Sequence, residues 1–429
     1  MTSSNQRSLI EIESNFGPDN YKPLPVVLSK GEGVWVWDVD NKKYLDMMSA
    51  YSAVSHGHSH PELLKVLHEQ SARLALTSRA FYTDTLGPYL ETITSVSNFD
   101  MALPMNSGAE AVETAIKASR RWAYRSKKIE PNKAEIIVAD GNFHGRTTTI
   151  ISFSSDANSK DDFGPHTPGF ISVEFGSSKA IEEAMTENTA AVLVEPIQGE
   201  GGIIIPPDNW LAEIRDICTK HGVLMILDEV QSGLGRTGKM FAFEHANIQP
   251  DGLILGKALG GGFMPVSCFL SSKEVMQWLN PGSHGSTFGG NPLAAAIGKR
   301  SIELLEEENL IENSRVLGEF FKNALGDINS NVIKEVRGKG LWIGVVIDPN
   351  FISGKELSKL LLKEGILCKE THETVIRFAP PLIINKEEIE WALEIIKTTI
   401  LKVESESRSE NEPSINESCV ADQTCRILF

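Results

Sequence analysis

Short apolar runs bounded by polar residues recur through the middle of the chain. Five of them are predicted strands, at residues 135–140, 190–195, 223–228, 252–256 and 266–271. Stretches with helical spacing, such as 109–126 and 209–220, separate several of these runs. Because short buried strands that alternate with helices form parallel β-α-β units, the pattern predicts a large, doubly wound, mostly parallel sheet.

The chain beyond Pro292 follows a second pattern. A long helical stretch leads into predicted strands at 332–336, 341–347 and 375–378, around a helix near 355–364. The predicted fold class is therefore α/β, with a large sheet domain and a smaller α+β C-terminal domain. The expected divisions are an N-terminal segment (1–48) that packs with the small domain, a large domain (49–300), a small domain (301–402) and a disordered acidic tail (403–429).

Charge and composition narrow the functions that such a fold could host. With 41 basic and 57 acidic residues, the net charge of −16 offers no basic surface for a nucleic-acid backbone. Polar residues interrupt every apolar run, which argues against a membrane-spanning helix. The five scattered cysteines form no C-x-x-C pair, and the first twenty residues lack the apolar core of a secretory signal. We expect a cytoplasmic protein without nucleic-acid or membrane partners.

Three motifs match known sites incompletely. Residues 233–238 fit G-x-G-x-x-G, but they do not turn directly from a strand into an apolar helix, so a functional loop is favoured over a dinucleotide site. The acidic strand end at 228–229 resembles that of a P-loop ATPase, but the glycine run at 252–257 is one residue too short for the partner loop. The histidines at 56, 58 and 60 lack accompanying carboxylates or cysteines, which favours a structural turn over a metal site. No metal is predicted.

The remaining candidates gather at one predicted edge of the sheet. Asp228 and Lys257 each end an apolar strand, so both should emerge at the same edge of the sheet. Residues 107–110 open a long helix, whose free N–H groups could hold a phosphate. Phe143 follows the strand at 135–140. A lysine, a carboxylate, a phosphate seat and an aromatic ring together are what pyridoxal 5'-phosphate requires.

The chemistry of this cofactor explains the residue types. The lysine amine must be unprotonated part of the time to form a Schiff base, and burial lowers its pKa. A carboxylate against the pyridine nitrogen keeps the ring protonated, so that it accepts electrons from the substrate carbon. Each feature alone is weak, since an aspartate that ends a buried strand is about as often structural. Their combination favours the cofactor.

Several runs of sequence resemble the class III pyridoxal-phosphate aminotransferases, over about residues 20–401. They are residues 194–200, 227–233, 255–262 and 284–292. Within the class, a further likeness to the ornithine δ-aminotransferases is carried by residues 20–21, 50–54, 76–82 and 377–381. The resemblance implies a fold-type-I transferase that forms a homodimer, with the active site at the subunit interface.

The resemblance also implies the roles of individual residues around the cofactor. Lys257 would be the Schiff-base lysine and proton shuttle, and Asp228 the partner of the pyridine nitrogen. Gln231 would bond the phenolic oxygen, and Phe143 would stack on the ring.

The phosphate group of the cofactor has its own implied partners. It would bind the backbone amides of Gly108 and Ala109, and the partner subunit's Thr287 would complete its seat. A single subunit would therefore be a poor enzyme.

The substrates implied are L-ornithine, as donor of its δ-amino group, and 2-oxoglutarate. By resemblance, Arg146 takes the α-carboxylate of ornithine, while Tyr21 and Tyr51 hold its α-amino end. Arg377 takes the α-carboxylate of the oxo acid, and Glu200 neutralises Arg377 by ion pairing while ornithine binds. The expected products are glutamate and glutamate 5-semialdehyde, which cyclises to pyrroline-5-carboxylate.

Alternatives stay open at this point. His144 and the run at 200–202 resemble the acetylornithine branch of the class, whereas Tyr51 favours the unmasked α-amine of ornithine. The alternative donors also include 4-aminobutyrate and lysine. An amino-acid racemase is a further alternative, because such enzymes use the same cofactor. A non-catalytic binding relative is disfavoured by the joint presence of Lys257, Asp228 and Arg377.

Overall fold

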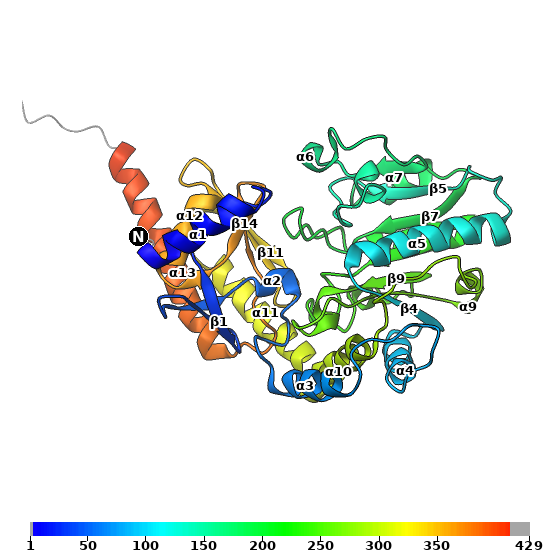
Figure 1. Cartoon of the computed structure of the whole chain (residues 1–429). Helices are drawn as coiled ribbons and strands as arrows, with labels where there is room; N and C mark the ends of the chain where they lie inside the picture. The colour runs from blue at the N-terminus through cyan, green and yellow to red at the C-terminus, as the bar shows by residue number, and fades with distance from the viewer. Residues whose placement is uncertain (1–2, 412–429) are drawn as a thin grey trace, which may run out of the picture.

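The middle of the chain forms a seven-stranded sheet in a computed structural model that describes residues 3–411 (Figure 1). In spatial order the strands are β4 (Met101–Met105), β10 (Ser267–Ser271), β9 (Gly252–Leu255), β8 (Leu224–Asp228), β7 (Thr189–Val194), β5 (Glu135–Ala139) and β6 (Phe170–Val173). Neighbours pair in parallel, except that β10 is antiparallel to both β4 and β9. The predicted mostly parallel sheet is confirmed, and its central strands are buried on both faces, as continuous apolar runs require.

Helices cover both faces of this sheet. Ile136 of β5 packs in a cluster with α5 (Gly108–Trp122), which crosses one face in Figure 1. The next residue, Ile137, packs in a second cluster with Trp210 of α8 (Trp210–His221) on the other face. This alternation follows from the two-residue period of a strand, and it gives the doubly wound arrangement.

A second sheet joins the beginning of the chain to its C-terminal part. Its order is β1 (Leu28–Glu32), β2 (Trp35–Asp38), β3 (Lys43–Asp46) and β13 (Ile366–Leu367), with β13 parallel to β3. The Trp35 indole packs edge-on against Trp391 and donates a hydrogen bond to Glu388. The N-terminal strands therefore pack with the small domain.

The C-terminal part contains a third sheet and three long helices. The sheet runs β11 (Ile333–Gly338), β12 (Ile343–Ile347), β15 (Val375–Phe378) and β14 (Lys369–Thr371), and its pairs are antiparallel. The helices are α11 (Leu310–Gly326), α12 (Gly354–Lys363) and α13 (Lys386–Asn411). These elements match the α+β pattern expected beyond Pro292.

The predicted division between residues 300 and 301 falls inside α10 (Pro292–Glu307). This helix packs against α3 (Pro61–Arg73), α4 (Leu86–Ser97) and α11, so it belongs to both halves of the molecule. Among the other α-helices, α1 (Ser4–Phe16) precedes the first strand. The rest are α2 (Ser49–Ser52), α6 (Ala157–Lys160), α7 (Ser178–Glu183) and α9 (Lys273–Met276). In residues 3–411, no helix has both the length and the apolar character needed to cross a bilayer.

The predicted start of disorder at residue 403 is wrong, because α13 continues to Asn411. Val403 is buried, and the carboxylate of Glu404 accepts hydrogen bonds from Ser330 (Oγ, 2.6 Å) and Asn331 (Nδ2, 2.8 Å). These partners lie far away in the sequence, so the polar composition of the segment could not reveal them. The rest of the predicted tail, residues 412–429, lies outside the described residues.

Replacing Glu404 with alanine should lower the thermal midpoint of unfolding. Ser330 and Asn331 would lose the oxygens that accept their hydrogen bonds, and each such bond contributes about 0.5–1.5 kcal/mol. Differential scanning calorimetry measures the change, with Ser405→Ala as control, because the exposed Ser405 hydroxyl contacts only the Lys402 carbonyl. Equal midpoints for the two variants would contradict a docked helix end.

Candidate active site

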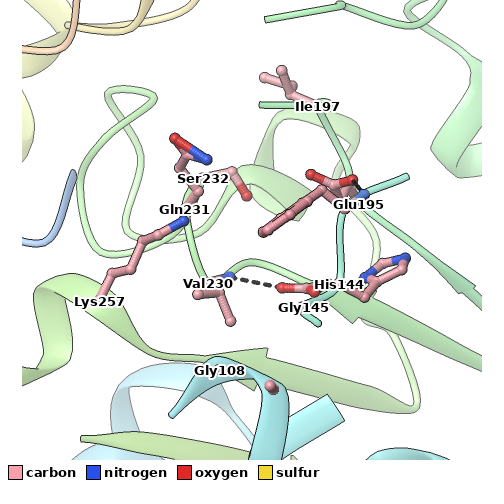
Figure 2. Close-up of a pocket in the computed structure, with 12 residues that line it drawn as sticks. Gly108, His144, Gly145, Glu195, Ile197, Val230, Gln231, Ser232 and Lys257 are labelled. Atoms are coloured by element: carbon pink, nitrogen blue, oxygen red, sulfur yellow. Dashed lines mark hydrogen bonds and ion pairs between the residues drawn. The ribbon is translucent and has the colours of Figure 1, made fainter. Parts of the chain in front are cut away.

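Two adjacent parallel strands deliver the predicted acid and lysine to one cavity. Asp228 is the last residue of β8, and Lys257 begins a short 3-10 turn (Lys257–Gly260) just after β9. Since β8 and β9 pair in parallel, their carboxyl ends lie at the same edge of the sheet. Both residues line the cavity drawn in Figure 2.

The cavity brings together the expected cofactor residues that come from one subunit. Its lining is Gly108, Ala109, Phe143, His144, Gly145, Glu195, Ile197, Asp228, Val230, Gln231, Ser232 and Lys257. In Figure 2, Lys257 and Gln231 lie on one side of the cavity, and His144 and Gly145 lie on the other. His144 and Glu195 were not predicted as site residues.

His144 and Asp228 form a buried pair. The Nδ1 atom of His144 lies 2.7 Å from Asp228 Oδ2, and the backbone N–H of Val230 donates to the other carboxylate oxygen. Burial lowers the pKa of His144, but the hydrogen bond and the charge of Asp228, helped by Glu195, outweigh it and raise the pKa above its usual value. In the sequence, His144 could have been identified as a site residue because it follows Phe143, just beyond a predicted strand of the parallel sheet.

Glu195 is a second buried carboxyl group on the cavity wall. Its oxygens accept the backbone N–H groups of Phe143 (2.9 Å) and Gly199 (3.3 Å). Burial raises its pKa to about 7, because the attraction of His144 and the two N–H groups only partly offsets the lost hydration. Glu195 therefore fixes the backbone at Phe143, the residue expected to stack on a ring.

The amine of Lys257 lies in a dry and crowded setting. Burial lowers its pKa, and the negative charges of Glu200 and Asp228 only partly restore it. A lysine with a lowered pKa is unprotonated for part of the time at neutral pH, as nucleophilic and proton-transfer chemistry requires. The residue also adopts a left-handed backbone conformation, with φ of 45°.

The first turn of α5 lies at the cavity, where the anion seat is expected. Ser107 and Glu110 make a reciprocal capping box: the Ser107 hydroxyl accepts the Glu110 N–H, and the Glu110 carboxylate accepts the Ser107 N–H. The following N–H groups, of Gly108 and Ala109, begin the helix and have no acceptor within it. A Cβ at Gly108 would approach Val230 Cγ1 to 3.0 Å, so glycine allows the loop after β8 to lie close to the seat.

An ion pair between a buried arginine and a half-buried glutamate lies beside this cavity. The Nη1 atom of Arg377, on β15, lies 3.0 Å from Glu200 Oε1, and Gln231 Nε2 donates to the same oxygen at 3.4 Å. The approach of Arg377 to Glu200 is close, but it does not have hydrogen-bond geometry, so Nε and Nη1 of Arg377 keep unused donors. These two nitrogens can therefore donate hydrogen bonds to a further carboxylate.

Tyr51 covers this pair from a strained turn. The Arg377 Cζ atom lies 4.9 Å from the centre of the Tyr51 ring. All four residues of α2 have positive φ, from 42° at Ser49 to 72° at Ser52, and such a left-handed conformation costs about 1–2 kcal/mol per residue. Burial raises the pKa of the Tyr51 hydroxyl, and the Arg377 charge opposes this rise.

Three further predicted residues lie outside the enclosed cavity. Tyr21 is 69% exposed. Arg146 is also exposed, with its guanidinium 5.7 Å from the Phe143 ring. Thr287 lies in a separate surface depression together with residues 76–79, and so it is not part of the same subunit's cavity.

The histidine turn has structural partners. His56 Nε2 lies 2.8 Å from the Ser301 carbonyl, His58 pairs with Asp46, and His60 with Glu308. Among the described residues, no group of three histidine, cysteine or acidic side chains is arranged to hold a metal.

Comparison with known proteins agrees with this geometry. The Aminotransferase class-III family matches residues 16–400. An ornithine aminotransferase of Macrococcus caseolyticus is 54% identical over 396 residues, covering 92% of this chain and 99% of that protein. The structure of the ornithine aminotransferase from Toxoplasma gondii, described with partial occupancy of PLP at its active site, is 40% identical. It superposes with a TM-score of 0.93, covering 94% of this chain and 96% of that chain.

A second branch of the family is also similar. The acetylornithine aminotransferase from Elizabethkingia anophelis is 45% identical, with a TM-score of 0.85 over 93% of this chain and 100% of that chain. The chain belongs to the class III aminotransferases, a family of enzymes that depend on pyridoxal phosphate. The resemblance read from the sequence is thus confirmed, together with the fold-type-I architecture.

The buried Glu195 carboxyl should make stability fall as pH rises from about 5 to 7. Its pKa is about 7 in the folded protein against 4.5 ordinarily, so the folded state holds the extra proton in this window. The contribution of Glu195 to the free energy of unfolding is present at low pH. It falls by up to about 1.4 kcal/mol for each unit by which the pH rises in this window. Urea denaturation of the cofactor-free protein should therefore show a shallower pH dependence for Glu195→Gln than for the parent chain.

The exposed Glu174 offers the matched control, because Glu174→Gln removes a carboxylate on the surface. Its pH dependence should follow that of the parent chain. Identical slopes for Glu195→Gln and Glu174→Gln would contradict a buried carboxyl group that keeps its proton near neutrality.

Proposed function

We propose that the protein transfers the δ-amino group of L-ornithine to 2-oxoglutarate with pyridoxal 5'-phosphate as cofactor. The products are glutamate and glutamate 5-semialdehyde, which cyclises to pyrroline-5-carboxylate. The observation that carries the proposal is one cavity that holds a half-buried lysine and a buried aspartate beside the Arg377–Glu200 pair. The relative of 54% identity named ornithine aminotransferase supports the same donor.

The residues present fit the cofactor. Lys257 would hold it covalently, Asp228 would pair with its ring nitrogen, and the α5 amides of Gly108 and Ala109 would bind its phosphate. Phe143 would cover one face of the ring and Gln231 would bond its phenolic oxygen. When bound, the cofactor supplies a ring that accepts electrons from the carbon bearing the transferred nitrogen.

His144 supports Asp228 in this arrangement. His144 Nδ1 lies 2.7 Å from one carboxylate oxygen of Asp228 and the Val230 N–H donates to the other, so both oxygens are held in place. Glu195 holds the Phe143 backbone from the same side of the cavity. The acid is therefore oriented before any ligand arrives.

Lys257 is the group suited to move a proton. Its lowered pKa leaves the amine able to accept a proton from a substrate carbon and to return it elsewhere. Its place at the end of β9, on a left-handed residue, directs the side chain into the cavity beside Gln231 (Figure 2).

The two substrates must bind in opposite senses, because ornithine presents its distal amine and 2-oxoglutarate its α-carbon. Glu200 neutralises Arg377 while ornithine binds, with Tyr51, Tyr21 and Arg146 at the α-amino-acid end. When the oxo acid enters, Glu200 moves aside and Arg377 takes its α-carboxylate. Removing one partner of a buried ion pair costs about 3–5 kcal/mol, which is enough to redirect a carboxylate.

Acetylornithine is the second candidate donor. His144, the run at 200–202 and the 45% identity to an acetylornithine aminotransferase favour it. Tyr51 favours ornithine, because its hydroxyl would meet the α-amine that acetylation masks. Transfer from 4-aminobutyrate or lysine, and racemisation, are separated from both by a donor panel with measurement of glutamate.

We further propose a cytoplasmic homodimer, in which Thr287 completes the phosphate seat of the neighbouring subunit. Its position in a depression with residues 76–79, apart from the cavity of its own chain, supports this exchange. The free thiols of Cys218, Cys268 and Cys368 fit a reducing compartment.

Lys257→Ala should abolish glutamate formation from ornithine and 2-oxoglutarate, because the lost amine is both the covalent anchor and the proton carrier. Loss of a proton-transfer group alone reduces a rate by about 100-fold or more. The control Lys355→Ala removes an exposed lysine of α12 and should keep full activity. Retained turnover in Lys257→Ala would refute the assignment.

Tyr51→Ile should lower kcat/KM for ornithine about tenfold or more, while acetylornithine is affected far less. A hydrogen bond to a charged group is worth about 1.5–3 kcal/mol, and only ornithine offers the charged α-amine. Tyr51→Phe is the matched variant, because it keeps the ring over Arg377 and removes only the hydroxyl. Equal losses for both donors would contradict α-amine recognition by Tyr51.

A further inference from the structure

The glycine loop at residues 233–238 places a fully buried arginine at the junction of the two halves. Arg236 has no exposed surface. Its Nη1 atom donates to the carbonyl oxygens of Leu341 (2.8 Å) and Pro380 (2.7 Å). Its Nη2 atom donates to the hydroxyls of Ser55 (3.0 Å) and Ser49 (3.3 Å). All four acceptors are neutral oxygens from three separate parts of the chain.

These acceptors connect directly to the substrate side of the site. Ser49 begins the left-handed turn that carries Tyr51, and Pro380 lies three residues beyond Arg377. The Ser49 hydroxyl also donates to the Ala379 carbonyl at 2.6 Å. One guanidinium thus ties the Tyr51 turn to the end of the strand that bears Arg377.

The choice of arginine fits a geometric role. A buried cation is costly to desolvate, and an apolar residue of similar size is often neutral or better for stability. Burial lowers the pKa of Arg236 to about 9, and the negative charge of Asp46 opposes the fall. The planar fork of arginine directs several donors at fixed angles, whereas lysine offers a single point charge on a flexible stem.

The turn needs such an anchor. A positive φ is unfavourable for residues other than glycine, and the turn contains four such residues in succession. This conformation persists only where surrounding contacts stabilise it. Without the Arg236 bonds, the turn can relax and carry the Tyr51 ring away from Arg377, where it now lies 4.9 Å from Cζ.

We propose that Arg236 is a positioning residue that fixes Tyr51 relative to Arg377 and thereby sets the preference for a donor with a free α-amine. The inference rests on the proposed function, since it assigns Tyr51 to that end of ornithine. Arg236 itself touches neither substrate nor cofactor; it acts through Ser49 and Pro380.

The test measures the ratio of kcat/KM for ornithine to that for acetylornithine, well below the thermal midpoint of each variant. Ser49→Ala removes one acceptor of Arg236 together with the Ser49–Ala379 hydrogen bond, whereas Arg236→Lys removes the fork, keeps the charge and leaves the Ser49–Ala379 bond in place. Both should lower the ratio at least fivefold, with the cofactor absorbance unchanged. In a Tyr51→Ile background, Ser49→Ala should change the ratio no further, because the two substitutions act through one side chain.

Ser314→Ala is the matched control. Its buried hydroxyl donates to the Arg236 backbone carbonyl at 2.9 Å and accepts the Leu341 N–H, so it stabilises the same junction without touching the turn. This variant should lose thermal stability and keep the donor ratio of the parent enzyme.

Two results overturn the inference in distinguishable ways. If the parent enzyme prefers ornithine and Ser49→Ala lowers only the thermal midpoint, Arg236 is merely structural and the proposed function survives. If the parent enzyme prefers acetylornithine, the proposed donor falls and the inference falls with it. Because Ser49→Ala is a small change, the outcome does not depend on whether Arg236→Lys folds.

Discussion

The parallel pairing of β8 with β9 is the constraint on which the active site depends. Its register sets Leu227 opposite Leu253 and Asp228 opposite Ile254. Since side chains alternate across a sheet, a slip of one residue would turn Asp228 to the opposite face. Both strands are buried throughout, so apolar packing on two faces holds this register. The relation of Asp228 to Lys257 is thus fixed by residues that never meet a substrate.

The second constraint is the balance of charge around the cavity. Asp228 is matched by His144, and Arg377 by Glu200, while Glu195 is satisfied by backbone N–H groups. Lys257 lies among these groups, and its proton affinity reflects all of them. The cofactor end and the carboxylate-binding end are also linked, because Gln231 donates to the same Glu200 oxygen that faces Arg377.

Much of this architecture is predictable from the local sequence pattern. The strand at 223–228 was predictable because a strand buried on both faces must be apolar throughout, and its terminal aspartate then marked the sheet edge. The hydrogen bond between His144 and Asp228 was not predictable, because it depends on how the strands that precede these two residues are arranged in the sheet. The order of α13 beyond residue 402 was missed for the same reason, since Glu404 is held by a loop distant in sequence. The predicted domain boundary at residue 300 falls inside α10, a helix that packs against both halves of the molecule.

The pairing of β3 with β13 has a consequence for how the polypeptide matures during synthesis. Residues 43–46 are synthesised before their parallel neighbour at 366–367, which follows more than three hundred residues later. Until then the early strands present an open hydrogen-bonding edge, of the kind that invites mispairing. Closure of so long a loop also delays the final contacts. The nascent chain therefore completes the sheet of β1, β2, β3 and β13 only after residue 367 has been made.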